Sequence, residues 1–243
     1  MIAREELTGT MELFSVRGDL DFHWLRPADS GTWPWRGGVP VTFAWHEPEL
    51  EPDPADSEEE FIPVDCLPMN TGCDGLILSD FARRTLEGLL LPAGELWPVR
   101  VLGHQYWWYN CLAMVNALDR DVTDADWEVV EGEWGEFRWI GTPRRLVFDP
   151  KALRDAPPVF RIPEFPQGVL FGGGAFAHAV VSNGLTGFRI DPVWSEGAGG
   201  VPDPAGFGFG DALEETDPDD LERKRGEART RLLNRRARIG QRD

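Results

Sequence analysis

Lysine, tyrosine and cysteine are scarce in this 243-residue chain, and it contains no long apolar run. It has 2 Tyr and 3 Cys, and Lys151 and Lys224 are its two lysines. So few cysteines exclude a disulfide scaffold and favour free thiols in a reducing compartment. No stretch approaches the roughly 18 consecutive apolar residues of a membrane-spanning helix. The opening MIAREELTGTMELF carries acids where a signal peptide has basic residues, so we expect a cytoplasmic protein that does not bind membranes.

Motifs for catalysis and metal binding are also missing. The chain has no G-x-S-x-G, no G-x-x-x-x-G-K-[ST] and no C-x-x-C. Cys66 and Cys73 lie seven residues apart, and Cys111 sits in an apolar run where a small hydrophobic residue fits. His178 falls in a short predicted helix, where we expect it to face solvent. We therefore predict a protein that is not an enzyme and uses no catalytic residue, cofactor or metal.

Negative charge is abundant, and it is unevenly distributed. The net charge is −18, but residues 221–243 hold nine basic and three acidic groups, a net of +6. The first 220 residues therefore carry −24. Such a body repels nucleic acid and attracts basic partners, so we expect no nucleic-acid ligand.

Eight of the acidic residues crowd residues 47–60, a segment that also contains three prolines. Proline removes backbone donors and like charges repel, so we expect a loop here rather than a helix or strand. The segment just before it, VTFAWHE at 41–47, alternates as a strand does.

A strand–helix–strand pattern occurs twice along the chain. The first copy predicts a strand at 75–78, a helix capped by Ser79 and a strand at 96–101. The second predicts a strand at 168–171, a helix through Phe176 that stops at Asn183-Gly184, and a strand at 187–190. Glycines and prolines correspond between the copies, as in Gly94 with Gly187. We therefore predict an α+β fold with mixed sheets, two βαβ-like units sharing one core, and a C-terminal helix.

Changes in composition suggest four regions. Residues 1–60 form a β-rich N-terminal region with the acidic loop 47–60, and 61–195 form the α+β domain. Residues 196–220 form a linker rich in Gly, Pro and acids, and 221–243 form a basic helical tail with a thin apolar stripe.

Residues 61–195 resemble a known family. The cues are DGLILSDFARRTLEGL, LWPVRV, QYWWYNCLAMVNALD, LVFDPKAL, PPVFRI and GVLFGGGAFAHAVVSNGLTGFRIDPVW. Together they resemble the immunity proteins of bacterial polymorphic toxin systems, in particular the Myxococcus-type group. The chain departs from that group at 172–174, where three glycines replace the usual polar helix cap. The resemblance implies an antitoxin that binds and occludes a cognate toxin protein encoded next to it, and it implies no catalytic residues.

Tryptophans and acids are the candidate partner-binding residues. Trp33 and Trp35 flank Pro34 in a loop rich in Gly and Pro, where large rings are hard to bury, and tryptophan is enriched among binding anchors. Rings folded back onto the core are the alternative. The acids would suit a basic toxin such as a nuclease. The candidate residues are Trp33, Trp35, Glu49, Glu51, Asp53, Asp56, Glu58, Glu59 and Glu60.

Two other functions stay open. Residues 172–177 satisfy G-x-G-x-x-A between a strand and a helix, and Asp191 lies where a dinucleotide-binding acid would sit. A nucleotide-binding enzyme using Gly172–Gly174 is therefore one alternative. An acidic regulator that mimics nucleic acid is the other, and it would bind many basic proteins in a salt-sensitive way.

Overall fold

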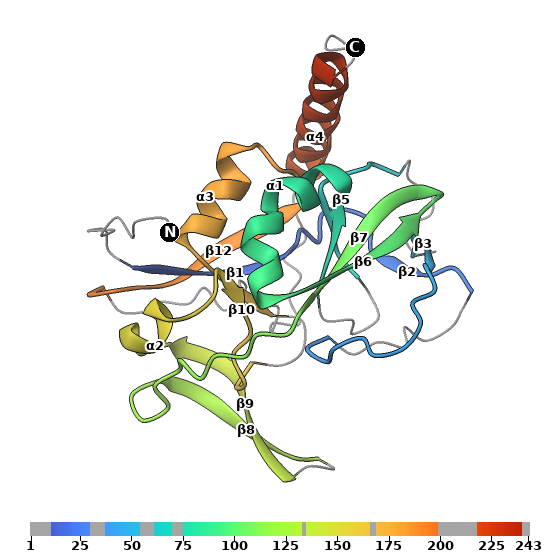
Figure 1. Cartoon of the computed structure of the whole chain (residues 1–243). Helices are drawn as coiled ribbons and strands as arrows, with labels where there is room; N and C mark the ends of the chain where they lie inside the picture. The colour runs from blue at the N-terminus through green and yellow to red at the C-terminus, as the bar shows by residue number, and fades with distance from the viewer. Residues whose placement is uncertain are drawn as a thin grey trace, which may run out of the picture.

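The structure is a computed structural model that describes residues 11–29, 37–53, 61–69, 75–132, 135–165, 169–198 and 218–239. Figure 1 shows β-sheets packed with short helices and one long C-terminal helix, and one of the sheets is mixed because β3 (Glu49–Pro52) pairs parallel with β6 (Gly94–Val101). This confirms the predicted α+β class. Candidate residues Trp33, Trp35, Asp56, Glu58, Glu59 and Glu60 lie outside the described residues.

The described elements follow one another in chain order and form three sheets. The four-stranded sheet has the order β10-β11-β1-β12, the six-stranded sheet β2-β3-β6-β7-β5-β4, and β8 pairs with β9. The elements are β1 Glu12–Gly18, β2 Leu25–Pro27, β3 Glu49–Pro52, β4 Cys66–Leu67, β5 Leu76–Ser79, α1 Asp80–Leu90, η2 Leu91–Ala93, β6 Gly94–Val101, β7 His104–Cys111, β8 Asp124–Gly132, β9 Gly135–Arg145, α2 Pro150–Arg154, β10 Val159–Phe160, β11 Leu170–Gly173, α3 Gly174–Ser182, β12 Phe188–Ser195 and α4 Pro218–Ile239.

The two predicted βαβ-like units are present, and each is split by an antiparallel strand. In the first unit β5 and β6 both pair antiparallel with β7, so they run parallel to each other on either side of it. In the second unit β11 and β12 flank β1 in the same way. The middle strand of the first unit, β7, follows that unit in the chain. The middle strand of the second unit, β1, precedes its unit by about 150 residues. Side chains of both units meet in one core cluster that includes Leu78, Leu86, Leu170 and Phe176.

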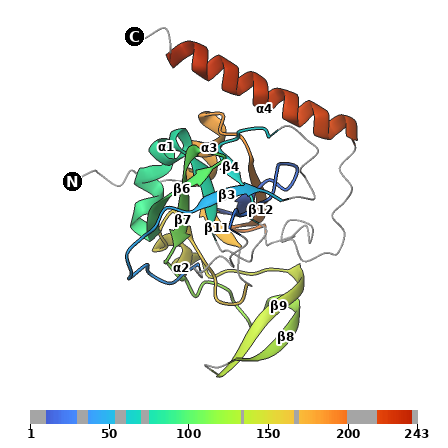
Figure 2. The same cartoon turned by 90° about the vertical axis from the view of Figure 1, so that its right-hand side faces the viewer.

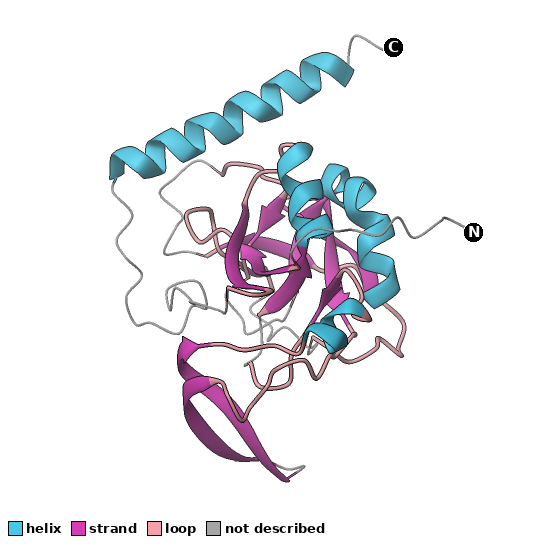
Figure 3. Ribbon diagram, turned by 90° about the vertical axis from the view of Figure 1, so that its left-hand side faces the viewer, coloured by secondary structure: helices cyan, strands magenta, loops and turns pink. Residues whose placement is uncertain are grey.

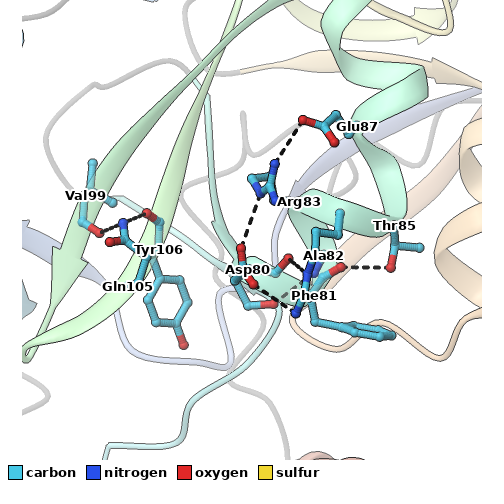
Figure 4. A network of polar contacts seen from close by, with 11 residues as sticks. Asp80, Phe81, Ala82, Arg83, Thr85, Glu87, Val99, Gln105 and Tyr106 are labelled. Carbon is cyan, nitrogen blue, oxygen red and sulfur yellow. Dashed lines mark hydrogen bonds and ion pairs between the residues drawn. The ribbon is translucent and has the colours of Figure 1, made fainter.

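Helix α1 forms for the reasons that the sequence suggested. The Ser79 hydroxyl accepts the Ala82 amide at 3.1 Å, which satisfies one of the free N–H groups of the first turn. Ala82, Leu86 and Leu90 follow at helical spacing and are fully buried. On the outer side, Arg83 bridges Asp80 and Glu87, as Figure 4 shows.

A buried carboxylate joins the two units. Asp65 is 4% exposed, and its Oδ1 accepts the Ser79 hydroxyl at 2.8 Å. Its Oδ2 accepts the amide of Thr186 at 2.8 Å and the hydroxyl at 3.0 Å. Ser79 caps α1 in the first unit, whereas Thr186 lies between α3 and β12 in the second. One side chain therefore holds the start of one unit's helix against the loop of the other.

The six-stranded sheet closes on itself. Strand β2 stands first in the sheet order and pairs with β3. It also forms a parallel bridge, between Leu25 and Met69, with the chain just after β4, the last strand in the order. The Leu25 amide donates to the Pro68 carbonyl at 3.0 Å. A separate buried cluster, which includes Leu25, Leu50 and Trp108, fills the space that this closure encloses.

Three predictions about the N-terminal region and the tail have outcomes here. The expectation that 47–60 contains no strand is wrong at Glu49–Pro52, which form β3 and pair with β2 and β6. The prediction of a strand at 41–47 is also wrong, because this segment crosses the face of the sheet and does not pair along an edge. The predicted tail helix exists as α4, and it lies on the side of the body away from the β8–β9 hairpin (Figures 2 and 3).

Candidate partner-binding surface

Residues 37–46, here called the crossing segment, lie over the end of the β6–β7 pair. The Gly38 amide donates to Asn110 Oδ1, and Asn110 Nδ2 donates to the Val39 carbonyl, both at 2.8 Å. The Val41 amide donates to Glu95 Oε2 at 3.2 Å. Asn110 is fully buried and lies opposite Glu95 across the strand pair. These two polar side chains fix the backbone of the crossing segment in place of strand pairing.

Tryptophans hold the other end of the crossing segment. Trp45 stacks on Trp97 with ring centroids 5.1 Å apart and on Trp108 with centroids 5.9 Å apart. Its indole N–H donates to the Pro98 carbonyl at 2.8 Å. Trp108 is fully buried and belongs to the core. The stack gives the surface above it a rigid aromatic base.

Two apolar side chains of the crossing segment are exposed to solvent. Val39 is 57% exposed and Phe43 is 53% exposed, next to the half-buried Trp45 and Trp97. An apolar patch on a rigid support, beside charged residues, is typical of a protein-binding surface. Neither Val39 nor Phe43 was among the candidates from the sequence. The alternation of 41–47 pointed to an ordinary strand at Phe43, and no motif singled out Val39.

The chain runs directly from this patch into the acids of β3. Glu47 lies 3.6 Å from Arg100, and Glu51 pairs with Arg26 at 2.6 Å. Glu49 Oε1 accepts the amide of Gly103 at 2.7 Å. These partners hold the carboxylates along β3 and the residues next to it, a surface here called the acidic edge.

Of the predicted candidate residues, Glu49, Glu51 and Asp53 are the ones that the structure places, and it places them together. Asp53 follows β3 directly, where its amide donates to the Trp24 carbonyl at 2.7 Å. With Glu47 they make four acids against the two arginines, Arg26 and Arg100, that pair with them. The described part of this edge therefore keeps a net negative charge, which suits a basic partner.

A strained leucine stands at the same edge. Leu102 and Gly103 form the two-residue turn between β6 and β7, and Leu102 has a φ of 49° and is 48% exposed. Branched apolar residues rarely adopt this left-handed conformation, which favours Gly or Asn. The Leu102 amide donates to the Leu50 carbonyl at 3.2 Å, so the turn is tied to β3. The Leu-Gly pair between two apolar strands was the sequence signal for this turn.

The glycine-rich turn is built for packing, and its sheet differs from a dinucleotide-binding fold. A Cβ on Gly172 would lie 3.1 Å from atoms of both Phe176 and Val16, whereas Gly173 and Gly174 have open space. Adjacent parallel strands are the context of the G-x-G-x-x-A fingerprint, but here antiparallel β1 separates β11 from β12. Asp191 pairs with Arg189 at 3.1 Å and lies 3.6 Å from Arg17.

The thiols and imidazoles do not gather into a reactive group in the described part of the chain. Cys66 and Cys111 are free and buried, and burial raises the pKa of each thiol, that of Cys66 strongly. His178 is exposed on α3, as expected. Among the described residues, no group of three or more His, Cys, Asp or Glu side chains could hold a metal ion.

Comparisons with known proteins add no relative. No protein-family model matches the sequence, and no curated protein matches it. Within the residues that the structure describes, no helix has the length and apolarity needed to span a membrane.

Proposed function

We propose that this protein is an immunity protein that binds and occludes a cognate bacterial toxin, and that the toxin is a basic protein. The proposal rests on the family resemblance of residues 61–195. The observation that carries the choice of surface is the junction of the exposed Phe43 with the acids of β3. The toxin would be encoded beside this protein and neutralised in the cytoplasm.

Apolar and charged residues have different roles in this proposal. Phe43 and Val39 supply apolar area that a partner can desolvate, and the contacts of Trp45 and Asn110 that hold the crossing segment keep the ordering cost low. Glu47, Glu49 and Glu51 supply a field that speeds encounter with a basic surface. Phe43 would therefore control how long the complex lasts, and the acids how fast it forms.

Co-expression tests the function. The protein encoded by the neighbouring gene is expressed alone and together with this chain, and cell survival and co-purification are measured. We expect the neighbour to kill cells alone, to be harmless in the presence of this chain, and to co-purify with it. Killing that continues at the same rate in the presence of this chain would show that the proposal is wrong.

Surface variants test the site. Phe43→Ala should weaken toxin binding at least tenfold, mainly through faster dissociation, because truncating a central aromatic anchor commonly costs that much. Val181→Ala is the matched control, since Val181 is 75% exposed but lies on α3. Glu47→Lys should slow association and flatten its salt dependence. Unchanged affinity of the Phe43 variant would move the interface elsewhere, and equal binding to unrelated basic proteins would favour an acidic mimic instead.

A further inference from the structure

The basic helix α4 is docked on the body by one short face. Lys224 Nζ contacts the Asp21 carboxylate and lies 4.0 Å from Asp19 Oδ2. One turn further along, Ala228 is 3% exposed and belongs to the cluster enclosed by the six-stranded sheet. Arg225 donates to the Asp21 carbonyl at 3.4 Å. These three residues lie at helical spacing and so form one stripe of α4.

Several described side chains of α4 are directed to the helix itself or to solvent. Arg223 pairs with Asp220 and Glu227, Arg231 pairs with Glu227, and Leu233 is 64% exposed. Ala228 buries a single methyl group, worth far less than a large apolar side chain. The ion pair between Lys224 and the Asp19–Asp21 turn is therefore a specific charged contact between this 22-residue helix and the body.

The carboxylates that receive Lys224 belong to the same edge as the candidate partner surface. The Asp19–Asp21 turn leads into β2, which pairs with β3 along Glu51. The carbonyl of Trp24, just before β2, accepts the amide of Asp53. The positive helix is thus seated at one end of the acidic edge whose other end is the crossing segment.

We propose that α4 is an internal competitor for this edge, a docked basic helix that a basic partner displaces on binding. The inference rests on the proposed function, because it takes the toxin as that partner. It also explains why a −24 body carries a +6 tail: the tail shields the acidic edge from weak, unspecific cations and yields to a surface that fits better.

Exchange of one cation for another is the physically reasonable way for α4 to leave. The side chains of Asp19 and Asp21 are 16% and 14% exposed, so removing Lys224 without replacement leaves two poorly solvated carboxylates close together. Burial raises the pKa of Asp19, as expected for a charge held partly out of water. Arg189 also acts on this pair from β12. A lysine or arginine of the partner would replace Lys224 and restore the balance.

Hydrogen exchange on the full chain without any partner tests the docking step. Lys224→Ala should raise exchange of the α4 amides about two- to fivefold, the effect of losing one partly exposed ion pair. Added salt should do the same to the unaltered chain. Arg231→Ala is the matched control, because Arg231 is exposed and only 3.8 Å from Glu227 on its own helix. Equal exchange in the two variants would overturn the docking step.

Affinity for the toxin tests the competition. Lys224→Ala should bind the toxin about two- to fivefold more tightly, because a larger fraction of the protein is already open. In the complex of the unaltered chain, α4 should exchange faster than in the free protein. Unchanged or weaker toxin binding by Lys224→Ala would overturn the inference while leaving the proposed function intact. A toxin that does not bind the unaltered chain at all would instead remove the proposed function, and the exchange result would still stand.

Discussion

The two βαβ units have the same order of elements but are completed in different ways. The first takes its middle strand, β7, from the chain that follows directly after β6 through the turn at Leu102. The second takes β1 from the start of the chain, far in sequence from β11 and β12. Local pairing closes the first unit at a low entropic cost, whereas the second forms only when the two ends of the body meet.

The first turns of α1 and α3 also show that the first unit depends less on distant residues than the second. Ser79 caps α1 with its side chain, but Gly173 at the start of α3 has no side chain to do so. α3 depends instead on packing, with Phe176 and Val180 buried against the first unit. The first unit therefore forms largely from its own residues, and the second needs the first. Asp65 links the two units directly, because its carboxylate accepts hydrogen bonds from Ser79 in the first unit and Thr186 in the second.

Removing Asp65 should be the most damaging of the changes considered. Asp65→Ala leaves the Ser79 hydroxyl and both donors of Thr186 without their acceptor in a buried place, and we expect a loss of about 3–5 kcal/mol in the free energy of unfolding. Asp149→Ala is the matched control, since Asp149 caps the short helix α2 from an exposed position and should cost about 1 kcal/mol. Urea denaturation measures both.

The Asp65 variant also tests whether the units depend on each other. If the contact between them is as described, its unfolding should stay a single transition at lower urea. Equal losses in the two variants would mean that the units are held together by apolar packing alone. The comparison of a self-sufficient first unit with a dependent second one would then fail.

Glycines at the start of the second strand sharpen the comparison. A Cβ on Gly94 would lie 2.2 Å from the Asn110 carbonyl oxygen, and one on Gly187 would lie 2.2 Å from the Cys66 carbonyl oxygen. Gly94 has an extended backbone, but Gly187 has a φ of +75°. Gly187→Ala therefore meets both a clash and left-handed strain, about 2–4 kcal/mol, whereas Gly94→Ala meets the clash alone, about 1–3 kcal/mol.

Gly184 separates these two costs. It has a φ of +57°, and a Cβ added there would meet nothing within 4 Å, so Gly184→Ala should cost only the strain, about 1 kcal/mol. Thermal denaturation of the three variants gives the ranking. A Gly94 variant as unstable as the Gly187 variant would show that the backbone difference between the units has no energetic effect.

Local sequence signals predicted the helices and strands of the two units, but they could not predict which distant strands pair with each other. The Ser79 cap and the buried stripe of α1 depend on residues that are close together in the sequence, so α1 and the strands on either side of it could be predicted. Nothing near β1 indicates that it pairs with β11 and β12, because that pairing depends on the whole chain. Segment 41–47 has a strand-like alternation, yet stacking of Trp45 on Trp97 holds it across the sheet.

The candidate surface was predictable in part for the same reason. Acid content alone singled out Glu49, Glu51 and Asp53, and β3 brings them to one edge. Exposure of Phe43 and the left-handed backbone of Leu102 are products of the tertiary fold. Phe43 lies in a segment with the alternation of a strand, and leucine rarely adopts the conformation found at Leu102.

The helix caps give small expected effects of opposite sign and the most direct test of the comparison. Ser79→Ala should lower the free energy of unfolding by about 1–2 kcal/mol, because it removes the α1 cap and one hydrogen bond to Asp65. Gly173→Ser should raise it by about 0.5–1 kcal/mol, since the position is extended, has open space, and gains both a cap and a stiffer unfolded chain. Opposite signs at equivalent positions, measured by urea denaturation, would establish that the second unit lacks what the first supplies for itself. A neutral Gly173→Ser would mean that packing of Phe176 already fixes the start of α3, so the missing cap costs the second unit nothing.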